Sequence, residues 1–244
     1  MAASVNTLTP ALKGCATMFP DQSHSPGSPA PDPAKPAFEI GKQFCAAEGN
    51  MTAGMARAAG NVTAGTPGEM NAGTAETALK LMLMTGQKLS GKTLGIVGFG
   101  RIGRETARKA HFGFGMKIVV HNRSAVPDED LDKLDAEQVD DIDHLLGRSD
   151  FVSLHCPADT KNRHLIDALQ LNKMKPDAYL INTAGGELVD EEALADALWH
   201  GTIGGAGLDV IHDEPAICDR LHGCENVVLL SHMSSTSQHA RKAV

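Results

Sequence analysis

The sequence predicts an α/β protein built on a doubly wound parallel sheet. Short apolar runs suited to buried strands alternate about six times with segments of helical periodicity. Residues 93–124 form the clearest strand–helix–strand unit, in which a glycine-rich turn joins the first strand to the helix. Parallel strands connected in this way lie in one sheet with helices on both faces, so the alternation and the glycine-rich turn together favour this architecture.

The glycine-rich turn lies between two apolar runs, 93–97 and 116–120, and is followed by a helical stretch without proline. Its glycines are Gly98, Gly100 and Gly103, in the pattern GxGxxG. The first permits a tight turn, the second lets backbone N–H groups approach a pyrophosphate, and the third lets the helix pack close to the strand. The helix N-terminus then holds phosphates through its N–H groups and its dipole. The context favours a dinucleotide site over a glycine-rich structural turn.

The residues at the end of the second strand distinguish a site for NADP from a site for NAD. A site for NAD usually has Asp or Glu here, which accepts from the ribose 2′-OH and repels a 2′-phosphate. This chain has Asn122, followed by Arg123 and Ser124. An amide, a guanidinium and a hydroxyl together suit a 2′-phosphate dianion. We therefore expect NADP as the cofactor and NAD as the alternative. Arg123 as a solvated loop residue is the competing interpretation.

The remaining elements follow in order along the chain. Strong helix formers with few polar positions predict a largely buried helix at 74–84. Val139, Ile142, Leu145 and Leu146 lie at helical spacing and predict a second helix. The other expected elements are strands at 151–156, 178–183, 205–210 and 226–230, and helices at 165–174 and 189–198, the last capped by Asp190.

Composition divides the chain into three parts. Residues 1–37 predict a disordered Pro-rich tail, because the prolines between 26 and 36 forbid a helix or a central strand. Residues 38–85 combine a Gly/Ala/Met-rich segment with the expected helix. Residues 86–244 carry the glycine-rich turn and the alternating strands, and we expect them to form the dinucleotide-binding domain.

Composition also excludes several classes of function. The formal net charge is −8 and aromatic residues make up 4%, so we expect no nucleic-acid partner and no membrane partner. The five cysteines are scattered without a CxxC pair, and the histidines form no ligand motif, so no metal site is expected. We expect a reduced, cytoplasmic setting. An Ala/Ser/Thr-rich start leaves a transit peptide open, although the first twenty residues hold one lysine and no arginine.

Polar residues directly after each strand are the candidates for chemistry, because ligands of such sheets bind at the carboxyl ends of the strands. His232 immediately follows one predicted strand, and Glu214 comes five residues after Asp209 at the end of another. A histidine paired with a carboxylate is the expected general acid for reducing a carbonyl. From spacing alone, a structural role for this histidine is the alternative.

These motifs resemble the D-isomer-specific 2-hydroxyacid dehydrogenases, and the turn at 121–124 most resembles their NADPH-dependent glyoxylate/hydroxypyruvate reductase branch. The resemblance runs from about residue 88 to 244. The matching segments are LSGKTLGIVG at 89–98, SDFVSLHCP at 149–157, MKP at 174–176, INTA at 181–184, GLDV at 207–210 and NVVL at 226–229. A looser resemblance identifies 38–85 as the remnant of a substrate domain and its linking helix, so the resemblance implies a Rossmann domain with a truncated substrate domain.

The resemblance also implies roles for individual residues. His232, in Ser-His-Met-Ser where the family has Pro-His-Ile-Gly, would protonate the substrate oxygen while hydride passes between NAD(P)H and a small 2-keto or 2-hydroxy acid. Glu214 matches the catalytic glutamate, and Asp209 would hold the nicotinamide amide. The resemblance further implies a homodimer. The other residues expected to bind the cofactor are Arg101 and Ile102 at the pyrophosphate, and Cys156, Pro157, Thr183 and Ala184.

One departure from the family pattern bears on activity. The family's Asn-Thr-Ala-Arg-Gly motif contains the arginine that grips the substrate carboxylate, and this chain has Gly185 at that position. A bidentate, charge-assisted contact is thereby lost. The alternative to a working reductase is therefore a catalytically impaired homologue that acts as a dinucleotide-binding or partner-binding module.

Overall fold

The computed structural model describes residues 67–212, 214 and 217–235. The predicted Pro-rich tail at 1–37 lies outside these residues. So does most of the segment assigned to a remnant substrate domain, from 38 to 66.

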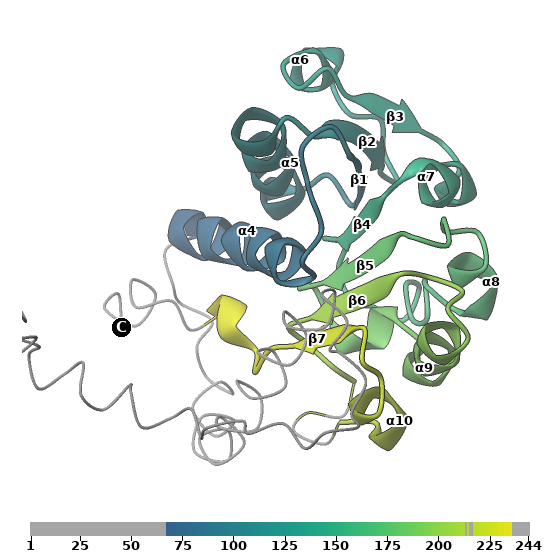
Figure 1. The fold of residues 1–244 in the computed structure, drawn as a ribbon. Helices are drawn as coiled ribbons and strands as arrows, with labels where there is room; N and C mark the ends of the chain where they lie inside the picture. Colours follow the sequence, from purple (N-terminus) through teal and green to yellow (C-terminus); the bar gives the residue numbers. More distant parts are fainter. Residues whose placement is uncertain (1–66, 213, 215–216, 236–244) are drawn as a thin grey trace, which may run out of the picture. The chain divides into compact units, whose positions relative to one another are not determined.

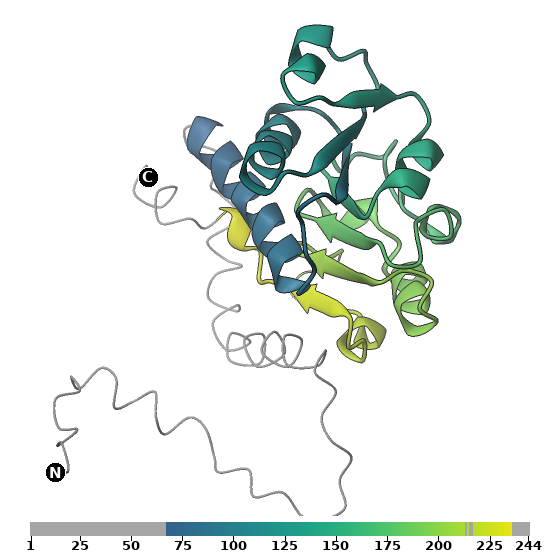
Figure 2. The same cartoon turned by 45° about the horizontal axis from the view of Figure 1, so that its top comes forward.

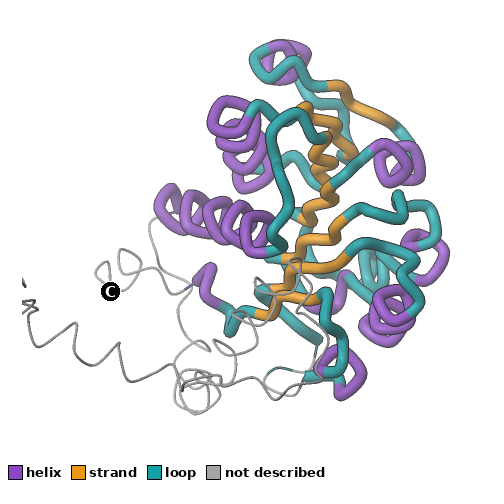
Figure 3. Tube along the Cα trace, in the orientation of Figure 1, coloured by secondary structure: helices purple, strands orange, loops and turns teal. Residues whose placement is uncertain are grey.

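Seven parallel strands form a single sheet in the order β3-β2-β1-β4-β5-β6-β7 (Figure 1). Figure 3 shows the strands as one continuous row between two sets of helices. The strand order reverses direction between β1 and β4, which in doubly wound folds marks the crevice where a ligand binds. The predicted Rossmann architecture is therefore confirmed. The strands are β1 (Thr93–Val97), β2 (Lys117–His121), β3 (Glu137–Val139), β4 (Phe151–Leu154), β5 (Tyr179–Asn182), β6 (Gly205–Leu208) and β7 (Val227–Leu229).

Helices cover both faces of the sheet (Figures 1 and 2). One face carries α4 (Pro67–Met84) and α5 (Arg101–Phe114), whose buried side chains share a core with Leu94 and Ile181. Leu154 and Leu180 point into the core of the opposite face. That face carries α7 (Ile142–Arg148), α8 (Ala168–Leu171), α9 (Glu191–Trp199) and α10 (Asp219–His222). The short α6 (Asp128–Asp132) precedes β3, and 3-10 turns form at η1 (Gly186–Leu188) and η2 (Met233–Ser235).

The buried strands explain why the sequence reads as continuous apolar runs there. Every residue of β4, β5 and β6 is buried, because both faces of these central strands are covered by helices. These strands end within two residues of their predicted limits. The predicted helix at 74–84 is also confirmed, and it begins earlier, at Pro67, a residue whose fixed φ suits the first turn of a helix.

Three predicted helices have other bounds than expected. Val139 belongs to β3, where it pairs with His121, and α7 begins only at Ile142 behind its cap Asp141. The helix expected at 165–174 is reduced to α8, and the helix expected at 189–198 begins only at Glu191, because Ile166 and Val189 form a β-bridge with each other. These corrections have one cause: pairing with a distant segment overrides the local periodicity. The predicted cap Asp190 is confirmed, since its carboxylate accepts from the N–H of Ala193.

The close approach of α5 to the end of β1 depends on Gly103. A Cβ added there would lie 2.2 Å from the carbonyl oxygen of Gly98, a backbone atom that cannot turn away. We expect Gly103→Ala to lower the free energy of unfolding by about 1–3 kcal/mol, measured by urea denaturation. The matched control is Gly113→Ala in the same helix, where nothing lies within 4 Å of the added Cβ. That variant should be neutral or stabilising by up to about 1 kcal/mol, and equal losses in both variants would contradict this packing argument.

His155 makes the fold sensitive to acid. Its side chain is half-buried, its Nε2 is 2.9 Å from Ser153 Oγ, and desolvation lowers its pKa from 6.5 to about 4. The imidazole of His155 binds a proton more readily in the unfolded chain than in the folded one. The free energy of unfolding is therefore highest above pH 6.5 and decreases as the pH falls toward 4. At about 1.4 kcal/mol per pKa unit, the loss is at most about 3.5 kcal/mol.

The test compares His155→Gln with His144→Gln, which alters an exposed histidine of α7. Urea denaturation between pH 7 and pH 4 measures the free energy of unfolding of each variant. We expect its decrease with acid to be smaller in His155→Gln alone. An unchanged pH dependence in that variant would contradict the role of His155.

Candidate active site

The glycine-rich turn forms an open cradle at the carboxyl end of β1. Gly98 has a positive φ of 94°, and a Cβ added to it would lie 2.7 Å from the backbone nitrogen of Cys156. Gly100 is the N-cap of α5, no side chain caps this helix, and nothing lies within 4 Å of an added Cβ. Arg101 and Ile102, expected to line the pyrophosphate, occupy the first turn of α5. An uncapped N-terminus beside open space fits the phosphates of a dinucleotide.

Asn122 has a structural contact that the sequence did not predict. Its Oδ1 accepts from the N–H of Phe99 at 3.0 Å, and its Nδ2 donates to the carbonyl of Ser124 at 2.9 Å. The side chain thus ties the glycine-rich turn to the end of β2. Its proposed contact with a 2′-phosphate stays a prediction.

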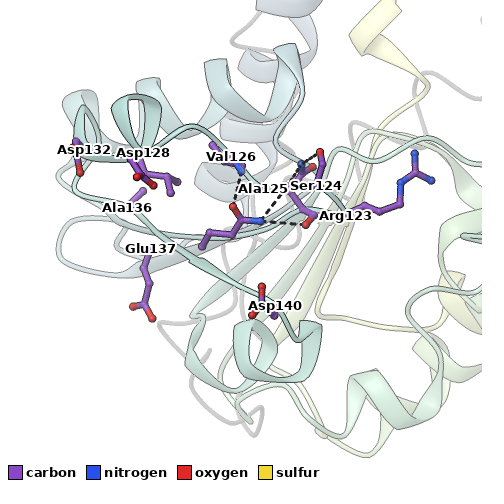
Figure 4. Close-up of a pocket in the computed structure, with 12 residues that line it drawn as sticks. Arg123, Ser124, Ala125, Val126, Asp128, Asp132, Ala136, Glu137 and Asp140 are labelled. Atoms are coloured by element: carbon purple, nitrogen blue, oxygen red, sulfur yellow. Dashed lines mark hydrogen bonds between the residues drawn. The ribbon is translucent and has the colours of Figure 1, made fainter.

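Arg123 is exposed and makes no hydrogen bond or ion pair with any residue that the structure describes. It borders a cavity of about 500 Å³ between β2, α6 and β3. Figure 4 shows the guanidinium extending away from the carboxylates of Asp128, Asp132, Glu137 and Asp140, which line the same cavity. The cation is therefore available to an anionic group from outside the chain.

The ends of β4 and β5 bring together two polar atoms without partners. His155 and Thr183 directly follow the paired residues Leu154 and Asn182, so they lie side by side. His155 Nδ1 and Thr183 Oγ1 are buried and lack a hydrogen-bond partner among the described residues. Buried polar atoms of this kind mark a place where a ligand or water completes the hydrogen bonding. The neighbouring Cys156 stays a neutral thiol, because desolvation raises its pKa to about 11.

The loop after β5 is held by the side chain of Asn182. Its Oδ1 accepts from the N–H groups of Ala184, at 3.0 Å, and Gly185, at 3.3 Å, while its Nδ2 donates to the carbonyl of Gly185 at 2.8 Å. Gly185 has an extended backbone with φ 177°. A Cβ added to Gly185 would lie 2.5 Å from the Cβ of Ala158, so the loop after β4 closes against this position.

Asp209 positions the segment that carries His232. Its fully buried carboxylate accepts from the N–H of Met233 at 2.7 Å and of Ser234 at 3.0 Å. Its carbonyl accepts from the N–H of His232 at 3.0 Å. His232 itself has φ 53°, a left-handed conformation that a non-glycine residue keeps only when its surroundings hold it. The expected contact of Asp209 with a nicotinamide amide stays a prediction.

The structure brings His232 and Glu214 into contact, as expected for a histidine–carboxylate pair. His232 Nδ1 lies 2.9 Å from Glu214 Oε2, and Glu214 Oε1 accepts from the N–H of Ile211 at 3.3 Å. The pair borders a cavity of about 300 Å³. The lining residues are Thr183, Ala184, Gly185, Gly186, Val210, Ile211, His212, Glu214 and His232. This arrangement can hold an imidazole ring in one orientation toward a small molecule.

Two other kinds of site receive no support from the described residues. No group of three or more His, Cys, Asp or Glu side chains among them could hold a metal ion. In the same part of the chain, no helix has the length and the apolar character that crossing a membrane requires.

Comparisons with known proteins agree with the geometry. Residues 66–234 match the family described as D-isomer specific 2-hydroxyacid dehydrogenase, NAD binding domain. A glyoxylate reductase from Thermococcus litoralis is 46% identical over 163 residues, which cover 67% of this chain and 48% of that protein. Glyoxylate/hydroxypyruvate reductase B from Pectobacterium carotovorum is 45% identical over 62% of this chain and 47% of its own length. The chain therefore spans about half the length of these relatives.

Solved structures show the same relationship. A glyoxylate reductase from Paecilomyes thermophila superposes with a TM-score of 0.67 and 36% identity, over 73% of this chain and 60% of that one. An NADPH-dependent glyoxylate/hydroxypyruvate reductase from Sinorhizobium meliloti, solved with NADP and malonate, gives a TM-score of 0.67 and 31% identity over 73% and 62%. The chain belongs to the D-isomer-specific 2-hydroxyacid dehydrogenases and carries their nicotinamide-dinucleotide-binding domain, in the glyoxylate/hydroxypyruvate reductase branch.

Proposed function

We propose that this protein is a reductase that transfers hydride between NAD(P)H and the carbonyl carbon of a small 2-keto acid, the class that contains glyoxylate and hydroxypyruvate. The observation that carries the proposal is the contact of 2.9 Å between His232 and Glu214 beside a cavity of about 300 Å³. Both residues follow strands of the sheet that also carries the open glycine-rich turn. The names of the similar proteins support the same activity.

The residues divide the reaction between them. Glu214 accepts from the Nδ1–H of His232, which leaves Nε2 to carry the proton for the substrate. The dinucleotide, when bound, supplies the hydride. The carbonyl carbon gains that hydride, the oxygen gains the proton of His232, and solvent then restores the proton to the imidazole. Asp209 keeps His232 in place through its contacts with the backbone of 232–234.

The dinucleotide would lie across the carboxyl ends of the central strands. Its pyrophosphate would meet the backbone at Gly100, Arg101 and Ile102, where α5 begins without a cap. The nicotinamide end would lie toward His232. Thr183, whose hydroxyl has no partner among the described residues, would face the part of the dinucleotide between the pyrophosphate and the nicotinamide. Cys156, Pro157, Ala184 and Asp209 are the remaining residues that we assign to this part of the site.

NADP is the dinucleotide that we propose. Arg123 is exposed and unpaired among the described residues, so it can contact a 2′-phosphate, and Ser124 can add a hydroxyl. Asn122 brings no carboxylate that would repel the phosphate. The similar reductase from Sinorhizobium meliloti was solved with NADP. NAD stays the alternative, and the homodimer and the cytoplasmic compartment also stay predictions.

A dinucleotide-binding module without turnover is the second candidate. Gly185, at the place of an expected arginine, is the observation that favours it. The intact contact between His232 and Glu214 favours the reductase, because a module that only binds has no need of this pair.

The proposed proton donor is tested with His232→Gln. We expect kcat for glyoxylate and hydroxypyruvate reduction to fall about 10²–10⁴-fold, since general acid catalysis contributes that much, while the Kd for NADPH changes little. Loss of NADPH absorbance gives kcat, and quenching of protein fluorescence gives the Kd. His200→Gln, at the exposed end of α9, serves as the control. Unaltered turnover in His232→Gln would exclude this mechanism.

The proposed cofactor preference is tested with Arg123→Ala. We expect its Kd for NADPH to rise about tenfold or more, because a charge-assisted contact with the 2′-phosphate is lost, and its Kd for NADH to stay nearly constant. Arg108→Ala removes another exposed arginine, on α5, and should change neither constant. Isothermal titration with each dinucleotide gives the four values. Equal effects on NADPH and NADH would rule out a role of Arg123 in selecting between them.

A further inference from the structure

The loop 122–126, which follows β2, is held by a side chain from the neighbouring strand β3. This side chain is Gln138, whose Oε1 accepts from the N–H of Val126 at 2.7 Å. Its Nε2 donates to the carbonyl of Ser124 at 3.1 Å and to that of Asn122 at 3.3 Å (Figure 4). One amide group therefore contacts the beginning, the middle and the end of the loop.

These contacts fix the backbone of the loop and leave two of its side chains available to a ligand. An amide has one acceptor oxygen and two N–H donors, and Gln138 uses both kinds of atom on backbone groups. Ser124 Oγ accepts from Asn122 Nδ2 at 3.2 Å, which leaves the hydrogen of its hydroxyl to donate. The guanidinium of Arg123 is exposed and unpaired among the described residues. The loop is ordered while its two donor side chains can still bind an anion.

The position of the loop matters because carboxylates lie near its cation. Asp128, Asp132 and Asp140 line the same cavity as Arg123. An arginine on a loose loop can pair with such carboxylates, and an ion pair within the chain competes with a phosphate from outside. In the structure the guanidinium extends away from them instead (Figure 4). The backbone that Gln138 holds in place keeps the cation on the side where it can meet a ligand.

We infer that Gln138 is a positioning residue that favours NADP over NAD, because it fixes Arg123 and Ser124 where the 2′-phosphate binds. This inference rests on the proposed function, since Gln138 acts through the contact proposed between Arg123 and that phosphate. A loop that is ordered beforehand loses little conformational freedom when the phosphate binds, which strengthens binding. NAD has a hydroxyl at this place and gains much less from a fixed guanidinium.

The experiment measures binding of NADPH and NADH to the full chain carrying Gln138→Leu, which removes the amide from a side chain of similar size. We expect the Kd for NADPH to rise about three- to tenfold, the effect of one net hydrogen bond, while the Kd for NADH stays nearly constant. Isothermal titration gives both constants. Equal weakening of the two dinucleotides, or no change in either, overturns the inference.

The matched control is Gln170→Leu, the same substitution on α8, away from the loop. It should change neither Kd. Urea denaturation shows whether each variant is folded. Gln138→Met, which keeps the length of the side chain, replaces Gln138→Leu in the experiment if leucine prevents folding, and the same two outcomes then decide.

A double-mutant cycle separates positioning from general support of the fold. If Gln138 acts through Arg123, Gln138→Leu should change the Kd for NADPH much less when Arg123→Ala is already present, because the two residues are then coupled. Additive losses overturn the inference. An effect of Arg123→Ala without an effect of Gln138→Leu overturns the inference alone. An unchanged Kd for NADPH in Arg123→Ala overturns the proposed cofactor preference and the inference together.

Discussion

The carboxylate of Asp209 is the group on which the candidate site depends most. It is fully buried at the end of β6, and its two oxygen atoms accept from the backbone of Met233 and Ser234. Hydrogen bonds to a charged acceptor are strong in a medium of low dielectric constant. They hold the segment after β7 against β6, and with it the left-handed backbone of His232. Without them, the imidazole would have no fixed position from which to meet Glu214.

The same device recurs at two other strands. Asn122, directly after β2, accepts from the N–H of Phe99 in the glycine-rich turn, and Asn182, at the end of β5, accepts from Ala184 and Gly185. All strands of a parallel sheet end at the same edge, so their loops lie beside one another and need contacts of this kind to stay ordered. Asn122 and Asn182 therefore use their side chains to hold neighbouring loop backbone in place. The groups left for a ligand among the described residues include the uncapped N-terminus of α5 and the hydroxyl of Thr183.

Local patterns in the sequence can indicate strands and turns, but they cannot indicate contacts between distant loops. The buried strands and the turn at Gly98 have strong local signals, and both were predicted. The strand β3 has only three residues, of which Val139 alone is buried, so no alternation could reveal it. The role of Asn122 depends on the distance between two loops, which no local pattern contains. The meeting of Glu214 with His232 could be predicted, because both follow strands that share one edge of the sheet.

The acid pair and the loop around Gly185 are built from different strands. The pair of His232 and Glu214 is built from the loops after β6 and β7. The carboxylate of Asp209 accepts from the N–H of Met233, next to His232. The region around Gly185 belongs to the loop after β5 and is held by the side chain of Asn182, whose backbone carbonyl also accepts from the N–H of Asp209. Gly185 lines the same cavity as His232 and Glu214, so a side chain placed at position 185 changes the surroundings of the acid pair, because residues around one cavity are energetically coupled.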